Sequence, residues 1–200
     1  FSTTALIKHV VKTQVAIFGG GVAGLWLLNR LRQRNIDCVL IENNQLGSGQ
    51  TIYSQGIIHS GVKYALTGKL TVSAEAMKSM PDLWRQCLEG SGEIDLSGVS
   101  VLSEHQYLWS PGSLASNLAV FLASKNLKSQ VSGLTKPDYP EAFSAPDFKG
   151  SVYRLEEPVL AVKTLIEALA GPYLDCLLQA ELQKVENNTL YLQNEKQEII

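Results

Sequence analysis

Three glycines near the start of the chain have the spacing of a phosphate-binding turn. Gly19, Gly21 and Gly24 form the pattern Gly-x-Gly-x-x-Gly directly after the apolar residues 15–18. Glycine lets the backbone approach a phosphate closely, and a helix that begins there offers unpaired N–H groups and a partial positive charge. Glu42 closes the next apolar run, about 20 residues further on, where a carboxylate can accept hydrogen bonds from ribose hydroxyls. These residues predict a site for the pyrophosphate and ribose of a dinucleotide.

The elements around the glycines are those that such a site requires. Residues 15–18 are apolar without alternation, which predicts a buried parallel strand. Apolar residues then repeat at helical spacing from Val22 to Leu31, and three arginines crowd the end of this helix, where cations complement the dipole. Residues 39–41 predict a second buried strand, which completes a strand–helix–strand unit over 14–42. A glycine-rich turn in an ordinary α/β protein is the alternative, and the acid after the second strand argues against a cofactor with a 2′-phosphate.

The composition is that of a globular chain. It has 200 residues, of which 45% are hydrophobic and 18% charged, so it can bury a sizeable core in one or two domains. The net charge of −2 gives no electrostatic case for nucleic acid or an anionic membrane surface, and no apolar run is long enough for a transmembrane segment. Three widely spaced cysteines favour a reducing compartment, and no cluster of Cys and His suggests a metal site. We therefore expect a cytoplasmic protein without metal, with peripheral attachment to a membrane left open.

Three further helices are expected downstream. Residues 68–89 carry an apolar stripe at helical spacing, and Pro81 would kink this segment or split it in two. A second helix is predicted over 113–126, with its first serine as the cap. A third would begin with Pro158 at its favoured first position and stop at Gly171.

Strand patterns fill most of the remaining segments. They occupy 97–109 and 151–155, on either side of an irregular stretch over 132–150. A hairpin that turns at Asn187-Asn188 is expected near the end of the chain. Alternating strands and helices of this kind predict an α/β fold.

A second glycine-rich segment makes the pattern more specific. Gly49 and Thr51 are followed by Gly56-Ile57-Ile58-His59-Ser60-Gly61 and Tyr64. Together with the first glycine triad and Glu42, these residues resemble the D-amino-acid-oxidase-like (DAO) FAD-dependent oxidoreductases, in particular the L-2-hydroxyglutarate oxidase, glycerol-3-phosphate dehydrogenase and glycine oxidase branches. The likeness is strong over residues 14–64 and weaker at Glu157-Pro158-Val159. It implies that the chain is the N-terminal portion of a longer enzyme.

The resemblance implies a fold and an activity. The fold would be a Rossmann-like FAD-binding domain interrupted by a smaller strand-rich α+β substrate domain, with boundaries at 12–74, 75–155 and 156–200. The activity would be FAD-dependent oxidation of a CH–OH or CH–NH substrate by hydride transfer to the flavin. The substrate would be a hydroxy acid, polyol phosphate or amino acid, and oxygen or a quinone would be the second acceptor. The alternatives are an NAD-dependent Rossmann dehydrogenase and a non-catalytic nucleotide-binding remnant.

The resemblance also implies which residues contact FAD. The glycine triad would hold the pyrophosphate and Glu42 the adenosine ribose. Gln50 and Thr51 would lie near the phosphates and the ribityl chain, and Gly56-Ile57-Ile58 would run beside the isoalloxazine ring. The complete expected set is Gly19, Gly20, Gly21, Val22, Ala23, Gly24, Glu42, Asn43, Gly49, Gln50, Thr51, Gln55, Gly56, Ile57 and Ile58.

His59 is the expected catalytic residue, and it has two interpretations. In one it lies near the flavin, where it orients the substrate or accepts a proton as hydride leaves. In the other it is a packing and hydrogen-bonding residue that fixes its loop. Arg154 could meet an acidic substrate, but an arginine in a strand more often lies on a solvated face.

Overall fold

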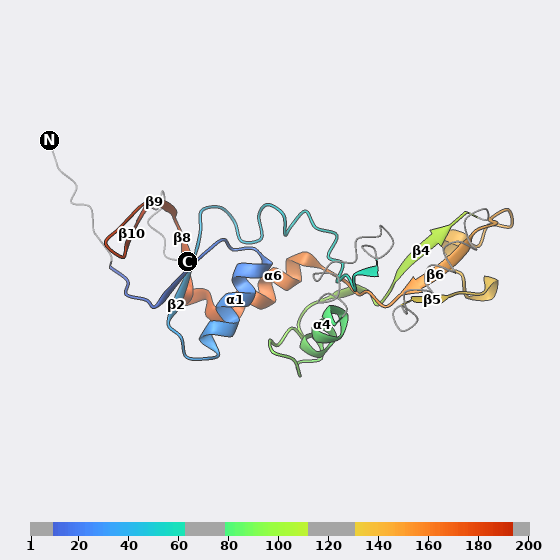
Figure 1. Cartoon of the computed structure of the whole chain (residues 1–200), viewed down its shortest axis with the longest axis horizontal. Coiled ribbons are helices and arrows are strands. Elements are labelled where there is room, and N and C mark those ends of the chain that lie inside the picture. Colours follow the sequence, from blue (N-terminus) through green and yellow to red (C-terminus); the bar gives the residue numbers. More distant parts are fainter. Residues whose placement is uncertain (1–9, 63–78, 112–130, 194–200) are drawn as a thin grey trace. The chain divides into compact units, whose positions relative to one another are not determined.

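The computed structural model describes residues 10–62, 79–111 and 131–193 (Figure 1). The chain divides into two compact units, one comprising Phe1–Ile52 with Leu169–Ile200 and the other Tyr53–Ala168. The first unit is therefore discontinuous in sequence, as an interrupted nucleotide-binding domain would be. The helix expected over 113–126 and the first half of the helix expected over 68–89 lie outside the described residues.

The first unit contains the predicted strand–helix–strand start. β1 (Val15–Phe18) pairs in parallel with β2 (Cys38–Glu42), and α1 (Val22–Arg32) connects them. These three elements confirm the expectation from the sequence. The prediction that the first strand is buried throughout is wrong, because β1 is an edge strand of the described sheet and only its Ile17 is buried. Phe18 is 51% exposed.

A third strand joins this sheet from far along the chain. β8 (Leu177–Gln179) pairs in parallel with β2, which gives the strand order β1-β2-β8. It follows η3 (Gly171–Cys176), a 3-10 helix that begins at the predicted stop signal after α6 (Val162–Ala170). The core of the unit is made of buried residues from these elements: Leu25, Leu28, Cys38, Leu40, Ile41, Leu169, Cys176 and Leu177.

The predicted hairpin near the end is confirmed. β9 (Glu181–Glu186) and β10 (Thr189–Gln193) are antiparallel and are joined by Asn187 and Asn188. Both asparagines have positive φ, at 47° and 60°. Asparagine tolerates this conformation better than most residues, and two successive residues of this kind make the tight turn that suits twisted strands.

The second unit is richer in antiparallel strands. β4 (Gln106–Ser110), β6 (Ser151–Leu155) and β5 (Val131–Gly133) form a sheet in the order β4-β6-β5. Two 3-10 turns, η1 (Lys136–Asp138) and η2 (Glu141–Phe143), occupy the stretch predicted to be irregular. α4 (Met80–Leu88) has Pro81 in its first turn. This proline therefore lies where a helix begins, which agrees with the expectation that it splits the segment and not with a kink inside one helix.

The region after Pro158 differs from the prediction. A helix was expected to begin at this proline, but β7 (Val159–Leu160) follows it and α6 begins only at Val162. β7 pairs antiparallel with β3 (Val101–Ser103), and the Pro158 carbonyl accepts a hydrogen bond from the Ile58 N–H. Pairing with partners distant in sequence therefore prevails over the local helix-start signal. No helix within the described ranges is both long enough and apolar enough to cross a membrane.

Candidate functional site

The glycine turn between β1 and α1 has a backbone that side chains would not fit. Gly19 has a φ of 103°, which L-residues rarely adopt, and its N–H donates to the Ile41 carbonyl at 2.9 Å. A Cβ on Gly24 would collide with the Gly19 carbonyl oxygen, and one on Gly21 would lie 2.9 Å from the Thr51 hydroxyl. Gly19 is thus required by its backbone conformation, and Gly21 and Gly24 by close packing around the helix start.

The N-terminus of α1 is open to an anion. Gly21 precedes the helix in an extended conformation and has no side chain that could cap it, and the first turn contains no acidic residue. The Val22 N–H donates to the Thr51 hydroxyl at 3.2 Å. The first turn of the helix therefore carries a partial positive charge and no acidic residue of its own, which suits a phosphate group.

Glu42 lies beside this turn and is held by backbone donors. Its Oε2 accepts from the Gly20 N–H at 2.7 Å, and its Oε1 accepts from the Asn44 N–H at 2.8 Å. An ionised carboxylate has about four acceptor positions, so two remain for hydroxyl donors. The Gly47 N–H donates to the Gly20 carbonyl at 2.8 Å and ties the following loop to the turn.

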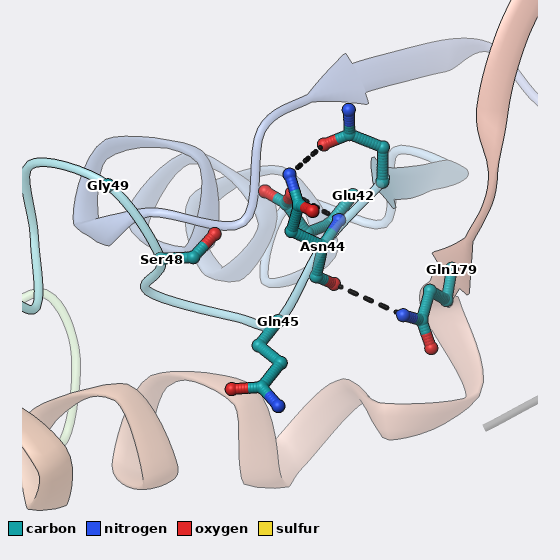
Figure 2. Close-up of a pocket in the computed structure, with 7 residues that line it drawn as sticks. Glu42, Asn44, Gln45, Ser48, Gly49 and Gln179 are labelled. Carbon is teal, nitrogen blue, oxygen red and sulfur yellow. Dashed lines mark hydrogen bonds between the residues drawn. The ribbon is translucent and has the colours of Figure 1, made fainter.

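An open cleft of about 710 Å³ adjoins Glu42. Figure 2 shows its polar lining, with Glu42 and Asn44 on the strand end and loop and Gln179 reaching across from β8. The Gln179 side chain donates to the backbone carbonyl of Asn44 at 3.4 Å, and the side-chain amide of Asn44 donates to Asn43 Oδ1 at 2.9 Å. The lining residues are Glu42, Asn43, Asn44, Gln45, Ser48, Gly49 and Gln179. Hydroxyl and amide chemistry of this kind suits a nucleoside better than an apolar ligand.

The structure brings one part of the expected site together. Every expected residue up to Thr51 belongs to the first unit: the glycines and Val22 and Ala23 form the turn and helix start, and Glu42, Asn43 and Gly49 line the cleft. Gln50 lies in the same loop and is exposed. The remaining residues, from Gln55 to His59, belong to the second unit.

In the second unit, Gly56 begins a short ladder with the residues around β7. Its φ is 69°, and a Cβ there would collide with the Leu160 carbonyl oxygen. The Leu160 N–H donates to the Gly56 carbonyl at 2.8 Å, and Ile57 bridges Val159 in antiparallel fashion. The segment expected beside the flavin ring is thus fixed by backbone pairing with residues about 100 positions later.

His59 contacts a buried carboxylate. Its Nδ1 lies 3.2 Å from Oε2 of Glu157, which is 2% exposed. The Ser60 N–H and hydroxyl both donate to Oε1 of Glu157, at 2.8 and 2.7 Å. Burial alone would raise the pKa of Glu157, but the hydrogen bonds from His59 and Ser60 outweigh it and bring the pKa below its usual value. The loop-fixing interpretation of His59 and the catalytic one are both compatible with this contact.

Arg154 forms an ion pair with Glu156. Its Nε lies 3.2 Å from Oε1 of Glu156, whose other oxygen is 3.2 Å from Nδ1 of His105. Arg85 donates to the Glu156 carbonyl oxygen at 2.8 Å. Within residues 10–62, 79–111 and 131–193, no three His, Cys, Asp or Glu side chains come together as a group that could hold a metal ion.

Sequence reasoning missed several residues of these two sites. Asn44, Gln45 and Ser48 follow Glu42 in a loop that was interpreted only as turn chemistry, although a loop after the acidic strand end borders the same cleft. Gln179 had no local signal, and the weak resemblance at Glu157-Pro158-Val159 gave Glu157 no role in a site, because each residue reaches its site only through pairing with distant segments.

The sequence profile of the DAO family, described as FAD dependent oxidoreductase, matches residues 14–187. The chain belongs to this family. It is 50% identical over 175 residues to the probable FAD-dependent oxidoreductase PA4991 of Pseudomonas aeruginosa, a match that covers 88% of this chain and 45% of that relative. The chain thus spans less than half the length of this curated relative.

Solved structures support the same conclusion. The crystal structure of PA4991 superposes with a TM-score of 0.68 at 37% identity and covers 90% of this chain and 42% of that one. Glycine oxidase from Geobacillus kaustophilus gives a TM-score of 0.64 at 22% identity, over 90% of this chain and 50% of that one. Dithionite-reduced L-α-glycerophosphate oxidase from Mycoplasma pneumoniae, a structure with FAD bound, gives a TM-score of 0.65 at 14% identity. This match covers 93% of this chain and 51% of that one. The last two comparisons show the shared Rossmann-like fold.

FAD is the cofactor that this membership assigns to the chain. The residues present fit it, because glycines let the backbone of the turn approach a pyrophosphate at a helix start without an acidic residue, and Glu42 keeps acceptor positions for a ribose. Family membership also favours FAD over the nicotinamide alternative. The fold class expected from the sequence, an α/β Rossmann-like domain interrupted by a second, strand-rich unit, is confirmed.

Proposed function

We propose that the whole protein oxidises a small molecule at a CH–OH or CH–NH carbon by hydride transfer to bound FAD. The observation that carries this proposal is the geometry at the start of α1, where a helix N-terminus with a glycine cap and no acidic residue in its first turn lies beside the backbone-held carboxylate of Glu42. The flavin, when bound, supplies the hydride acceptor. The protein supplies position and electrostatics.

Each part of the first unit has a role in this proposal. The N–H groups of the first turn of α1 bind the pyrophosphate, with Thr51 bridging from the following loop. Glu42 accepts hydrogen bonds from the adenosine ribose at the edge of the polar cleft. Asn43 and Gly49 line the same cleft and border the nucleoside.

His59 acts on the proton in this proposal. As hydride leaves the substrate carbon, the hydroxyl or amine proton must go to a base, and a neutral imidazole nitrogen is suited to this transfer near neutral pH. Gly56, Ile57 and Ile58 form a rigid backbone beside it, so the histidine is presented from a fixed loop. Hydroxy acids, polyol phosphates and amino acids are the substrate classes proposed, with oxygen or a quinone as the second acceptor.

The visible absorption spectrum of the purified protein, before and after addition of FAD and desalting, tests the cofactor. We expect a retained flavin spectrum with maxima that differ from those of free FAD. A folded protein that retains no flavin would contradict the proposal and favour the non-catalytic remnant. A protein that retains a nicotinamide nucleotide instead of flavin would overturn the proposal in favour of an NAD-dependent dehydrogenase.

Anaerobic addition of substrates tests the reaction. We expect bleaching of the flavin by a member of the 2-hydroxy acid, glycerol phosphate or amino acid panels, and recovery of the colour when oxygen or a quinone is admitted. Retained flavin that no CH–OH or CH–NH compound reduces, although dithionite reduces it, would separate a failed substrate assignment from a failed cofactor assignment.

A further inference from the structure

The Glu157 carboxylate is a buried group with three donors around it. Oε1 receives the N–H and the hydroxyl of Ser60, and Oε2 faces Nδ1 of His59. A carboxylate that is 2% exposed is costly unless it is paired and hydrogen-bonded, so these contacts are what permit its burial. Its pKa, which burial would raise and these hydrogen bonds lower, indicates that it is ionised near neutral pH.

Ionisation of Glu157 determines where the proton of His59 lies. An ionised carboxylate only accepts hydrogen bonds, so the hydrogen between Oε2 and Nδ1 must belong to Nδ1. In a neutral imidazole the other nitrogen, Nε2, then carries the lone pair. Within the described parts of the chain, Nε2 has no hydrogen-bond partner, and the histidine side chain is 34% exposed against 2% for that of Glu157. The buried carboxylate of Glu157 can orient the imidazole, and the more accessible imidazole of His59 can react.

The backbone around this pair is rigid. Glu157 lies between β6 and β7, and the Ile58 N–H donates to the carbonyl of the next residue, Pro158, at 3.0 Å. The Leu160 N–H donates to Gly56 in the same ladder. The two segments that carry the carboxylate and the imidazole are therefore held in register by main-chain hydrogen bonds.

We propose that Glu157 is a positioning residue, which fixes His59 as the tautomer with hydrogen on Nδ1 and a free lone pair on Nε2. This inference rests on the proposed function, which gives that lone pair its role. When the substrate carbon loses hydride, the hydroxyl or amine proton passes to Nε2, and the imidazolium that forms is stabilised by the adjacent carboxylate of Glu157.

The tautomer can be measured directly in the whole protein. Long-range ¹H–¹⁵N NMR spectra of protein labelled at histidine distinguish a protonated from an unprotonated ring nitrogen, and the signal of His59 is identified by its loss in His59→Gln. In the neutral form of the ring we expect Nδ1 to be protonated and Nε2 unprotonated. A wild-type His59 with its hydrogen on Nε2 would overturn the inference, and this result needs no variant.

Two neighbouring substitutions form a matched pair. In Glu157→Gln the side-chain amide can donate to Nδ1, so we expect His59 to change to the Nε2–H tautomer. Glu156→Gln makes the same chemical change one residue away, at a carboxylate that contacts Arg154 and His105, and should leave the His59 tautomer unchanged. An unchanged His59 tautomer in folded Glu157→Gln would refute the positioning role.

Flavin content and substrate reduction separate this inference from the proposed function. We expect Glu157→Gln to retain FAD as the wild type does, but to be reduced by substrate roughly 10²-fold more slowly. Ser60→Ala, which keeps the carboxylate, should keep the Nδ1–H tautomer and serves if Glu157→Gln does not fold. The correct tautomer in a protein without bound flavin would leave the Glu157 assignment standing and contradict the function alone.

Discussion

The side-chain amide of Asn29 donates a hydrogen bond of 2.8 Å to the Leu169 carbonyl oxygen, 140 residues further along the chain. The same amide also donates to the Leu25 carbonyl at 2.9 Å within its own helix. Leu169 lies in the last turn of α6, where carbonyl groups have no partner inside the helix. A buried polar side chain thus satisfies an open helix end and links the two segments that make up the first unit.

Asn29→Ala should destabilise the protein. The substitution leaves the buried Leu169 carbonyl without this donor, and an unsatisfied buried group of this kind costs about 1–3 kcal/mol. Thermal or urea unfolding measures the loss. Gln33→Ala is the control, because Gln33 is an exposed amide one turn later on the same helical segment, and its loss should change stability by less than about 0.5 kcal/mol.

Gly21→Val should abolish FAD binding in a folded protein. The first atom of the new side chain would already lie 2.9 Å from the Thr51 hydroxyl, and the branches would occupy the space of the pyrophosphate. Retention of the flavin spectrum after desalting is the measurement. Gly171→Val is the control in the same unit, since a Cβ there meets no atom within 4 Å. Unchanged flavin affinity in Gly21→Val would contradict the phosphate-site assignment.

Glu42→Gln should weaken FAD binding on the order of 10-fold or more. A hydrogen bond to a charged group contributes about 1.5–3 kcal/mol, and the amide removes the charge that ribose hydroxyls would contact. Fluorescence titration of the apoprotein with FAD measures the dissociation constant. Glu181→Gln, at an exposed position on the hairpin strand β9, should leave that constant unchanged. Equal losses in both variants would show a general charge effect instead.

Gly56→Ala should destabilise the second unit. The residue has a φ of 69°, which costs roughly 1 kcal/mol for a side chain, and the Cβ would also meet the Leu160 carbonyl oxygen. We expect a loss above about 1 kcal/mol by chemical unfolding. Gly98→Ala in the same unit places its Cβ in open space and should be tolerated. Similar stability of the two variants would refute the packing argument for Gly56.

The stability contributed by Glu157 should be lost in acid. Burial raises its pKa and hydrogen bonds from His59 and Ser60 lower it, with a net value below the usual 4.5. A group whose folded pKa is depressed stabilises the fold above its unfolded pKa, and the effect disappears as pH falls through the folded value. The difference in unfolding free energy between wild type and Glu157→Gln should therefore shrink as the pH falls below about 4.5. A difference independent of pH down to the acid unfolding limit would contradict the ionised, paired state.

The features that sequence predicted are those with a local cause. The glycine turn, α1, β2 and the Asn187-Asn188 hairpin each depend on residues within a few positions, so spacing alone locates them. The helix expected at Pro158 failed because Val159 pairs with Ser103 and Ile57, partners that no local signal reveals. For the same reason the sequence did not indicate the roles of Gln179 and Glu157. The domain boundaries at 12–74, 75–155 and 156–200 stay predictions, as do the individual contacts expected with FAD.

The discontinuous first unit also has a consequence for how the chain folds. Leu40 of β2 pairs with Leu177 of β8, so the sheet cannot be completed until the ribosome has made the whole of Tyr53–Ala168. At 5–20 residues per second this delay is on the order of 10 s, which is long compared with the folding of most small units. During that time one edge of β2 presents unpaired N–H and C=O groups that can pair with other strands. The strands that are synthesised early therefore wait for β8 before their sheet is complete, and until then they can pair with the wrong strand.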